Sequence, residues 1–235
     1  MIILGIETST RTGSVAIVEE EKIIAEYTLN IKETHTSRLM PAIDHILKDA
    51  QLTIHQMDAV AVSLGPGSFT GLRIGVATAK GLCLALRKPL IGIPTLDAFA
   101  HNICYTSHLI CPLLDARREE VYTAIYRYRL PIGRHELEKL TDDMVLPLEE
   151  LLSQIDHSTI FVGDVFDGYR SLVEKEMQGK ASFAPPNLSL PRAANVAVLG
   201  LRKLKSDEES DLREIAPLYV RRPEAEVKWK EKHQK

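Results

Sequence analysis

The sequence predicts an α/β fold built from two similar halves in tandem. Short, β-branched apolar runs alternate with helical patterns along the chain, as in α/β domains. A strand–turn–strand pattern near Glu7 recurs 108 residues later, where Asp115 superposes on Glu7 and Ala124-Ile125 on Ala16-Ile17. With 235 residues, of which 45% are hydrophobic, the chain can form one large domain or two small ones.

Three antiparallel strands are expected first, joined by tight loops. Ile2–Ile6 and Gly13–Val18 are apolar runs, and Lys22–Ile31 alternates between apolar and polar residues. A helix over His35–Ala50 follows, and its apolar stripe includes Met40. Pro41 should kink this helix or confine Met40 to an irregular start.

The most informative stretch is Leu64–Lys88, which follows an apolar strand at Asp58–Leu64. Gly65-Pro66-Gly67 should stop the strand, and Ser68 or Thr70 can cap the next helix. The sequence contains no Gly-Lys-Ser or Gly-Lys-Thr after these glycines, so the loop is not of the Walker type.

That helix carries a ridge of small residues at four-residue spacing: Gly71, Gly75, Ala79 and Cys83. Its glycines, with Gly81, cost about 3 kcal/mol of helix propensity relative to alanine. Close approach of another backbone normally offsets such a cost. The neighbour is another element of the same subunit, a partner chain, or a phosphate at the start of the helix.

The remaining strands and helices are predicted from the same apolar patterns and turn residues. Strands are expected at Leu90–Ile93, from Leu109 to Asp115, at Glu120–Tyr128 and at Thr159–Val162; helices are expected at Thr95–Cys104, Pro147–Ile155, after Gly163-Asp164, and at Arg192–Lys205; Ala184-Pro185-Pro186 is a linker.

Two lobes are expected, over residues 1–106 and 107–235, with a C-terminal helix at 191–206 that can join the first lobe. The chain after Ser206 is strongly charged and ends in a basic tail from Lys228.

Composition excludes several classes of protein. A net charge of −3 gives no global basic field for nucleic acid. Three cysteines, an odd number in apolar surroundings, suggest buried reduced thiols rather than a disulfide framework. No charged leader and no uninterrupted apolar run of 18 residues is present, so we expect a cytoplasmic protein without a membrane span.

The turn at Glu7-Thr8-Ser9-Thr10 offers hydroxyls and backbone N–H groups at a strand end. It suits a nucleotide phosphate, with Glu7 holding Mg²⁺ through water, or it is a plain polar β-turn. The corresponding turn, Ala116–Glu120, carries four long charged side chains, which prevent a tight phosphate cradle. Asp115 with Arg117 and Arg118 is an ion-paired turn or an anion site.

Other chemistry has little support in the sequence. The eight histidines form no His-x-x-x-His pair, so no metal site is expected. No Gly-x-Ser-x-Gly elbow occurs, and no cysteine lies in an electropositive turn.

Several blocks together carry a family resemblance. They are Gly5–Ser9, His35–Pro41, Gly65–Gly75 (GPGSFTGLRIG), Ala79-Lys80-Gly81, Asp115–Arg118 with Glu120-Val121-Tyr122, and Pro217-Leu218-Tyr219 with Arg221-Arg222-Pro223. Through these blocks the chain resembles the TsaB (YeaZ) family of the TsaD/TsaB group, which takes part in threonylcarbamoyladenosine (t6A) modification of tRNA.

The resemblance implies an actin-like ATPase fold of the actin, Hsp70 and sugar-kinase type, with two ribonuclease-H-like lobes. It also implies kinship with TsaD, the catalytic subunit, whose metal histidines lie on one helix as His-x-x-x-His. Here that region offers Asp97 and a single histidine, His101. The resemblance therefore implies a subunit that has lost the metal site and is not an enzyme on its own.

The implied role is to bind and activate TsaD for threonylcarbamoyl transfer to adenosine 37 of tRNAs that read ANN codons. The ATPase TsaE would act through the TsaB–TsaD complex, and a TsaC-type enzyme would supply threonylcarbamoyl-adenylate. Homodimers are implied when TsaD is absent, and tRNA would be reached through the complex. ATP or ADP at the heterodimer interface is the one cofactor that the resemblance allows.

In the family, the first long helix and the glycine-ridge helix meet TsaD. Their counterparts here are His35–Ala50 and Thr70–Arg87, and Gly75→Leu is expected to abolish association. The expected interface residues are Arg38, Leu39, Ile43, Gly71, Leu72, Gly75, Val76, Ala79 and Cys83.

Three other functions stay open at this point. A small-molecule kinase of the same superfamily would need the second phosphate turn, which Arg117–Glu120 disrupts. A glycoprotease-like peptidase would need a nucleophile or a two-histidine metal site. A dimeric scaffold without a link to tRNA is the third alternative.

Overall fold

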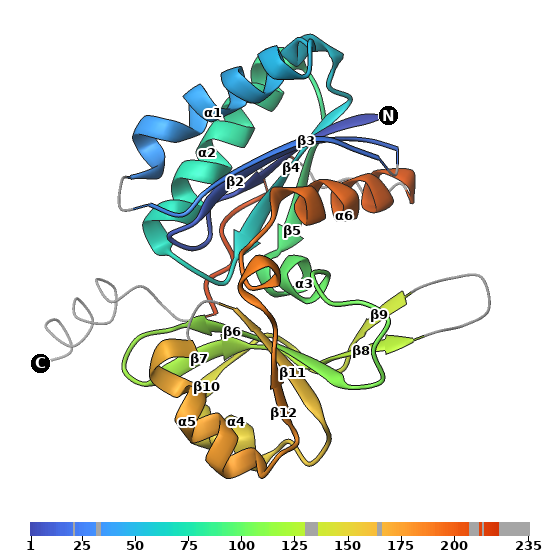
Figure 1. The fold of residues 1–235 in the computed structure, drawn as a ribbon. Helices are drawn as coiled ribbons and strands as arrows, with labels where there is room; N and C mark the ends of the chain where they lie inside the picture. The colour runs from blue at the N-terminus through green and yellow to red at the C-terminus, as the bar shows by residue number, and fades with distance from the viewer. Residues whose placement is uncertain are drawn as a thin grey trace, which may run out of the picture.

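The computed structural model describes residues 1–220 except 21, 32–33, 130–135, 164–165, 207–211 and 213. Two mixed sheets form two lobes, one above the other in Figure 1. The expected Arg221-Arg222-Pro223 block and the basic tail from Lys228 lie outside the described residues.

The first sheet has the strand order β3-β2-β1-β4-β5. The first three strands in the chain are antiparallel, as the sequence predicts, and β4 and β5 run parallel to β1. Their bounds are β1 Ile2–Glu7, β2 Gly13–Glu19, β3 Lys22–Leu29, β4 Ala59–Gly65 and β5 Leu90–Pro94.

The second sheet repeats this arrangement in its main path, β10-β7-β6-β11-β12. Here too three antiparallel strands are followed by two parallel ones. This repetition confirms the predicted fold class, an actin-like arrangement of two ribonuclease-H-like lobes. The bounds are β6 Leu109–Asp115, β7 Glu120–Thr123, β8 Tyr126–Arg129, β9 Glu136–Lys139, β10 Met144–Pro147, β11 Thr159–Gly163 and β12 Ala181–Phe183.

The single strand expected at Glu120–Tyr128 is two strands, β7 and β8. Both pair with β6, and the break at Ala124-Ile125 lies near Pro112 of β6, which has no N–H to donate to a ladder. The freed Ile125 N–H donates instead to Thr141 Oγ1 at 3.0 Å. Strands β9, β10 and β12 were not predicted, because they are only three or four residues long.

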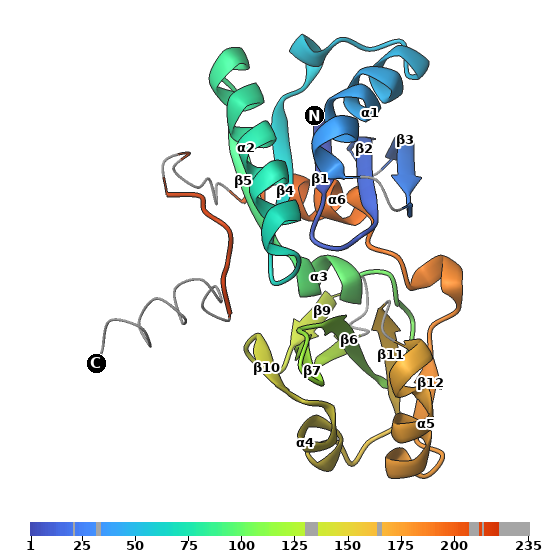
Figure 2. The ribbon, with the colours of Figure 1, turned by 90° about the vertical axis from the view of Figure 1, so that its left-hand side faces the viewer.

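Helices α1 (His35–Asp49) and α2 (Phe69–Leu86) cover one face of the first sheet (Figure 2). Ser68 caps α2, since its hydroxyl accepts from Gly71 N at 3.3 Å, one of the two predicted alternatives. Pro41 lies inside α1, and Met40 is 50% exposed, so Met40 does not belong to the buried stripe as expected.

Three shorter helices follow. Helix α3 (Thr95–Ala100) lies between the two lobes, and helices α4 (Leu148–Ser153) and α5 (Phe166–Met177) belong to the second lobe. The expected extension of α3 to Cys104 is wrong. The chain turns after Ala100, because the Asn102 side chain donates to the carbonyls of Leu188 and Leu190 at 2.8 and 2.9 Å.

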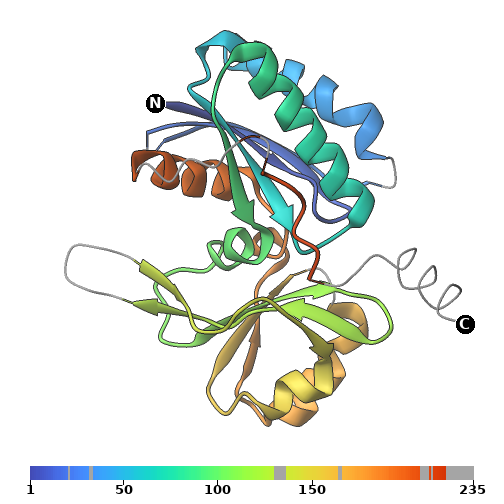
Figure 3. The same ribbon diagram turned by 180° about the vertical axis from the view of Figure 1, so that it is seen from behind.

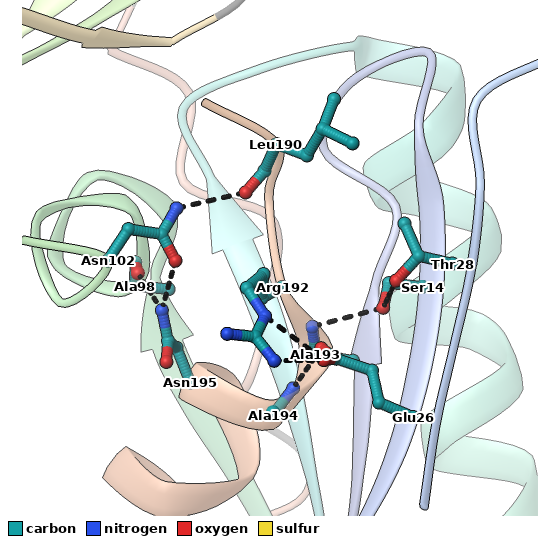
Figure 4. Close-up of polar contacts among 10 residues, drawn as sticks. All are labelled: Ser14, Glu26, Thr28, Ala98, Asn102, Leu190, Arg192, Ala193, Ala194 and Asn195. Carbon is teal, nitrogen blue, oxygen red and sulfur yellow. Dashed lines mark hydrogen bonds and ion pairs between the residues drawn. The ribbon is translucent and has the colours of Figure 1, made fainter. Parts of the chain in front are cut away.

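The last helix, α6 (Ala193–Lys205), packs on the opposite face of the first sheet from α1 and α2 (Figures 1 and 3). Its N-terminus is held by neighbouring strands. Ser14 Oγ accepts from Ala193 N at 3.2 Å, and the Glu26 carboxylate accepts from Ala194 N at 3.1 Å and pairs with Arg192 (Figure 4). These contacts satisfy N–H groups that a helix start leaves open.

A pair of asparagines ties together the two chain crossings between the lobes. Asn195 of α6 donates to Ala98 O at 2.9 Å and to Asn102 Oδ1 at 2.7 Å (Figure 4). Because Asn102 also bonds the segment that leads into α6, the crossing after α3 and the crossing after β12 form one hydrogen-bonded joint.

All three cysteines are free thiols. Cys83 and Cys111 are buried, as expected, and burial raises their pKa to about 11 and about 12. Cys104 is exposed, contrary to the expectation, because it lies in the turn after α3.

Candidate functional site

The glycine ridge of α2 packs against its own subunit. A Cβ on Gly71 would lie 2.1 Å from the carbonyl oxygen of Thr8, and a Cβ on Gly75 would lie 2.2 Å from Thr8 Oγ1. Real Cβ atoms do not approach other atoms this closely. The sequence left three neighbours open for the ridge: another element of the same subunit, a partner chain or a phosphate. The turn after β1 is the neighbour found, so Gly71 and Gly75 accommodate an element of the same subunit.

The expected interface residues lie mostly inside the subunit. Eight are buried: Leu39, Ile43, Gly71, Leu72, Gly75, Val76, Ala79 and Cys83. The ninth, Arg38, lines a small groove between α1 and the β2–β3 strands, with Arg11 and His35. Five of them, Leu39, Ile43, Val76, Ala79 and Cys83, belong to the core between α1, α2 and the sheet, so the ridge faces its own subunit in this structure; that these helices also contact a partner stays a prediction. The proposed Gly75→Leu test therefore reports on folding, not on association.

The Glu7–Thr10 turn is closed against the start of α2. All four residues are buried, and the Thr8 hydroxyl donates to Gly71 O at 2.8 Å. The Ser9 carbonyl accepts from Ser68 N at 2.5 Å, so it uses an N–H that a phosphate would otherwise take. The proposed nucleotide residues Glu7, Thr8, Ser9 and Thr10 thus face the chain itself in this structure.

The Glu7 carboxyl is fully buried at the end of β1. Its Oε1 accepts from Ser9 N at 2.5 Å, while Oε2 and the hydroxyl oxygens of Ser9 and Ser63 have no hydrogen-bond partner within the described chain. Burial raises the pKa of Glu7, and the polar neighbours Ser9 and Ser63 offset this only in part. A protonated Glu7 can donate to one of these hydroxyls, which satisfies two buried groups at once.

Glu7→Gln is expected to stabilise the protein at pH 8 but not at pH 4. The folded state of the wild type holds the Glu7 proton more tightly than the unfolded state, so its stability falls as pH rises above the ordinary value of 4.5. Glutamine keeps the Oε1 acceptor and supplies a permanent donor. We expect a gain of at least about 2 °C in Tm at pH 8, measured by scanning calorimetry.

The control for this comparison is Glu19→Gln, at the exposed last position of β2. Its Tm should stay within about 1 °C of the wild type at both pH values. A loss of stability for Glu7→Gln at pH 8, or an equal gain at pH 4, would show that Glu7 is ionised in the folded protein.

The corresponding turn of the second lobe has a different backbone. Arg117, Arg118 and Glu119 all adopt left-handed conformations, with φ of 62°, 55° and 64°. Their side chains are exposed, and Asp115 Oδ1 accepts from the backbone N–H of Arg117 at 2.7 Å. The carboxylate of Asp115 is thus used to hold the turn.

Asp97 and His101 lie close together, but the hydrogen bond between them uses the backbone carbonyl of Asp97 and not its carboxylate. His101 Nδ1 donates to the Asp97 carbonyl oxygen at 2.8 Å, and the Asp97 carboxylate accepts from Tyr126 and Lys139 at 2.7 and 2.9 Å. Burial lowers the pKa of His101. Within the described ranges, no three His, Cys, Asp or Glu side chains cluster as metal ligands would.

The outer face of α2 is the feature that the sequence analysis missed. We call it the docking face and define it as Thr70, Arg73, Ala77, Gly81, Leu84 and Ala85, all exposed. A Cβ on Gly81 would meet nothing within 4 Å, and Leu84 is 67% exposed. A second series at four-residue spacing, Ala77-Gly81-Ala85, runs beside the buried ridge and could have signalled this face.

By length and composition, α2 is the one helix of the described chain that could cross a membrane. Only a third of it is buried, and those buried residues pack on the first sheet. Leu84 is the large apolar side chain that α2 exposes on the docking face, beside Ala77 and Ala85.

A C-terminal segment, which we call the strap and define as Glu214–Val220, runs past the start of α2 (Figure 3). Leu218 N donates to Leu64 O at 2.7 Å, which anchors the strap to the end of β4. Ile215 is buried in the core of the first lobe. Helix α6 and the strap thus both pack with the first lobe.

Comparisons with known proteins agree with this architecture. The family model described as TsaD, tRNA N6-adenosine threonylcarbamoyltransferase, matches residues 22–229. The chain is 34% identical to the tRNA threonylcarbamoyladenosine biosynthesis protein TsaB of Bacillus subtilis, over 97% of this chain and 98% of that protein.

Solved structures show the same likeness. YeaZ from Pseudomonas aeruginosa superposes with a TM-score of 0.76 at 27% identity, covering 93% of this chain and 99% of that one. The ADPNP-bound activator of the 2-hydroxyisocaproyl-CoA dehydratase from Clostridium difficile superposes with a TM-score of 0.51 at 12% identity, covering 88% of this chain and 97% of that one. This second likeness is one of fold alone.

Proposed function

Because the chain belongs to the TsaB family of t6A biosynthesis proteins, within the wider TsaD family, we propose that it is the non-catalytic partner of a TsaD enzyme. In this role it binds and activates TsaD for threonylcarbamoyl transfer to adenosine 37 of tRNAs that read ANN codons.

The docking face is the observation that carries the proposal. It presents exposed apolar and small residues with one charged side chain, Arg73. Ala77 and Gly81 lack bulk, so a partner helix can approach the α2 backbone closely. Apolar helix faces that remain uncovered in a monomer are typical of protein–protein interfaces.

Two features of the chain support a non-catalytic role. The Glu7–Thr10 turn holds Ser68 N through the Ser9 carbonyl, where a nucleotide-binding lobe would hold phosphate. The Asp97 carboxylate, in the region of the TsaD metal histidines, is engaged by Tyr126 and Lys139. Both positions are occupied by contacts within the fold.

The remaining partners follow from the same role. TsaE would act through the complex with TsaD, and tRNA would reach the complex rather than this chain alone. In the absence of TsaD, two copies of the docking face would pair as a homodimer. ATP or ADP would bind at the heterodimer interface, because the Glu7 turn of this chain is closed.

Sedimentation velocity tests the proposal directly. Mixed at equal concentration with TsaD from the same genome, the chain should sediment as one heterodimer species, and its homodimer should disappear. If the two proteins sediment separately at micromolar concentration, the chain is not a stable TsaD partner.

A further inference from the structure

Arg73 lies over the Phe69 ring and beside Tyr219 at the start of the docking face. Its guanidinium carbon is 3.7 Å from the centroid of the Phe69 ring and 6.0 Å from that of Tyr219. Arg73 Nε donates to Tyr219 Oη at 3.0 Å. The two rings are also 5.1 Å apart, so α2 and the strap meet through this group of three residues.

These contacts fix the guanidinium but leave its charge available. Nε is used by the Tyr219 hydroxyl, and no carboxylate among the described residues forms an ion pair with Arg73. The side chain is exposed. Its two terminal nitrogens therefore remain free to donate to an acceptor in solution or on a partner.

A stacked arginine is suited to bidentate recognition of a carboxylate. Its planar fork matches two carboxylate oxygens, and prior ordering reduces the entropy lost on binding. The bidentate fork depends on the planar guanidinium, so lysine cannot reproduce it even though its ammonium can still lie over an aromatic ring.

On this basis we propose that Arg73, positioned by its contacts with Phe69 and Tyr219, binds a carboxylate of the TsaD subunit at the edge of the docking face. This inference rests on the proposed function and adds its specificity-determining contact. It also gives the strap a role, since Tyr219 positions Arg73 from the C-terminal end of the chain.

A phosphate of tRNA is the competing ligand for such an arginine. The surroundings favour the protein carboxylate. The adjoining residues Ala77, Gly81 and Leu84 are uncharged, and the next cation along this side of α2, Lys80, is half-buried, followed by the exposed Arg87 at the end of the helix. A nucleic-acid groove needs an open row of cations along the backbone. One face of Phe69 is covered by Arg73, so that face is closed to base stacking.

Affinity for TsaD, measured by biolayer interferometry on the full chain, tests the inference. Arg73→Lys and Arg73→Ala should each weaken binding at least 10-fold, and Tyr219→Ala should weaken it by a smaller factor. Wild-type affinity should fall with added NaCl more steeply than that of Arg73→Ala, because an ion pair is screened by salt.

Arg170→Lys is the matched control. Arg170 also stacks on an aromatic ring, 4.1 Å from the Phe183 centroid, but it lies in the second lobe. The affinity of the Arg170→Lys variant for TsaD should stay within twofold of the wild-type affinity.

The outcomes separate this inference from the proposed function. If Gly81→Leu abolishes TsaD binding while Arg73→Lys and Arg73→Ala bind within twofold of the wild type, the docking face stands and the role of Arg73 is wrong. If Arg73→Ala instead lowers tRNA binding by the isolated chain and leaves TsaD binding unchanged, the ligand is phosphate and the inference is overturned.

Discussion

Gly71→Ala is expected to destabilise the protein by about 2–4 kcal/mol, although it adds a single methyl group. The new Cβ would lie 2.1 Å from the Thr8 carbonyl oxygen, a backbone atom that cannot rotate away. The Thr8 hydroxyl also donates to Gly71 O, so a shift of the turn breaks that hydrogen bond. Overpacking of this kind typically costs 1–3 kcal/mol, with a further cost of about 1 kcal/mol for the lost hydrogen bond.

Gly81→Ala is the matched control on the same helix. Its Cβ points into open space, so the change should stabilise α2 by about 1 kcal/mol through helix propensity. Urea unfolding followed by circular dichroism measures both variants. Equal effects of the two substitutions would mean that the ridge does not pack against the Thr8 turn.

Gly81→Leu is expected to abolish association with TsaD while the fold stays intact. A leucine here adds bulk at the centre of the docking face and meets no atom of its own subunit within 4 Å of the Cβ. A partner helix seated on Ala77 and Gly81 would be displaced by the new side chain. We expect the affinity to fall at least about 100-fold, equivalent to about 2.7 kcal/mol.

Gly168→Leu provides the comparison for that variant. Gly168 lies in α5 of the second lobe, and its Cβ would also meet nothing within 4 Å. It should bind TsaD as the wild type does, and both variants should keep the wild-type circular dichroism spectrum. Wild-type affinity of Gly81→Leu would place the TsaD contact elsewhere on the chain.

Most of the fold could be predicted from the sequence, because apolar runs and glycine turns mark each buried element. The strand before Gly65, the Ser68 cap and the duplicated strand order all follow from local patterns. Strands β9 and β12 could not be predicted in this way. They are short and carry polar residues, and their pairing depends on neighbours distant in the sequence.

The small-residue series that the sequence suggested for a partner lies against its own subunit, and the partner that we propose would contact the exposed series of the same helix. Four-residue spacing places Gly71 and Gly75 on one face, yet spacing alone does not say whether that face meets a partner or the Thr8 turn. The outward series Ala77-Gly81 has the same spacing. Only the three-dimensional structure shows which of the two is covered.

The contacts of Arg73 with Phe69 and Tyr219 could be predicted only in part from the sequence. Phe69 and Arg73 are one helical turn apart, so their contact follows from local geometry. Tyr219 reaches them from 146 residues away in the chain. No periodic pattern connects the strap with α2.

The central claim is that this chain acts through TsaD, by means of the docking face, and has no transferase activity of its own. The most direct measurement is t6A formation on an ANN-reading tRNA, by mass spectrometry, with TsaD, TsaE, threonylcarbamoyl-adenylate and ATP supplied. We predict t6A with wild-type chain and with Gly168→Leu, and a loss to the level without the chain for Gly81→Leu. Formation of t6A by the chain without TsaD, or equal yields with wild type and Gly81→Leu, would contradict the account.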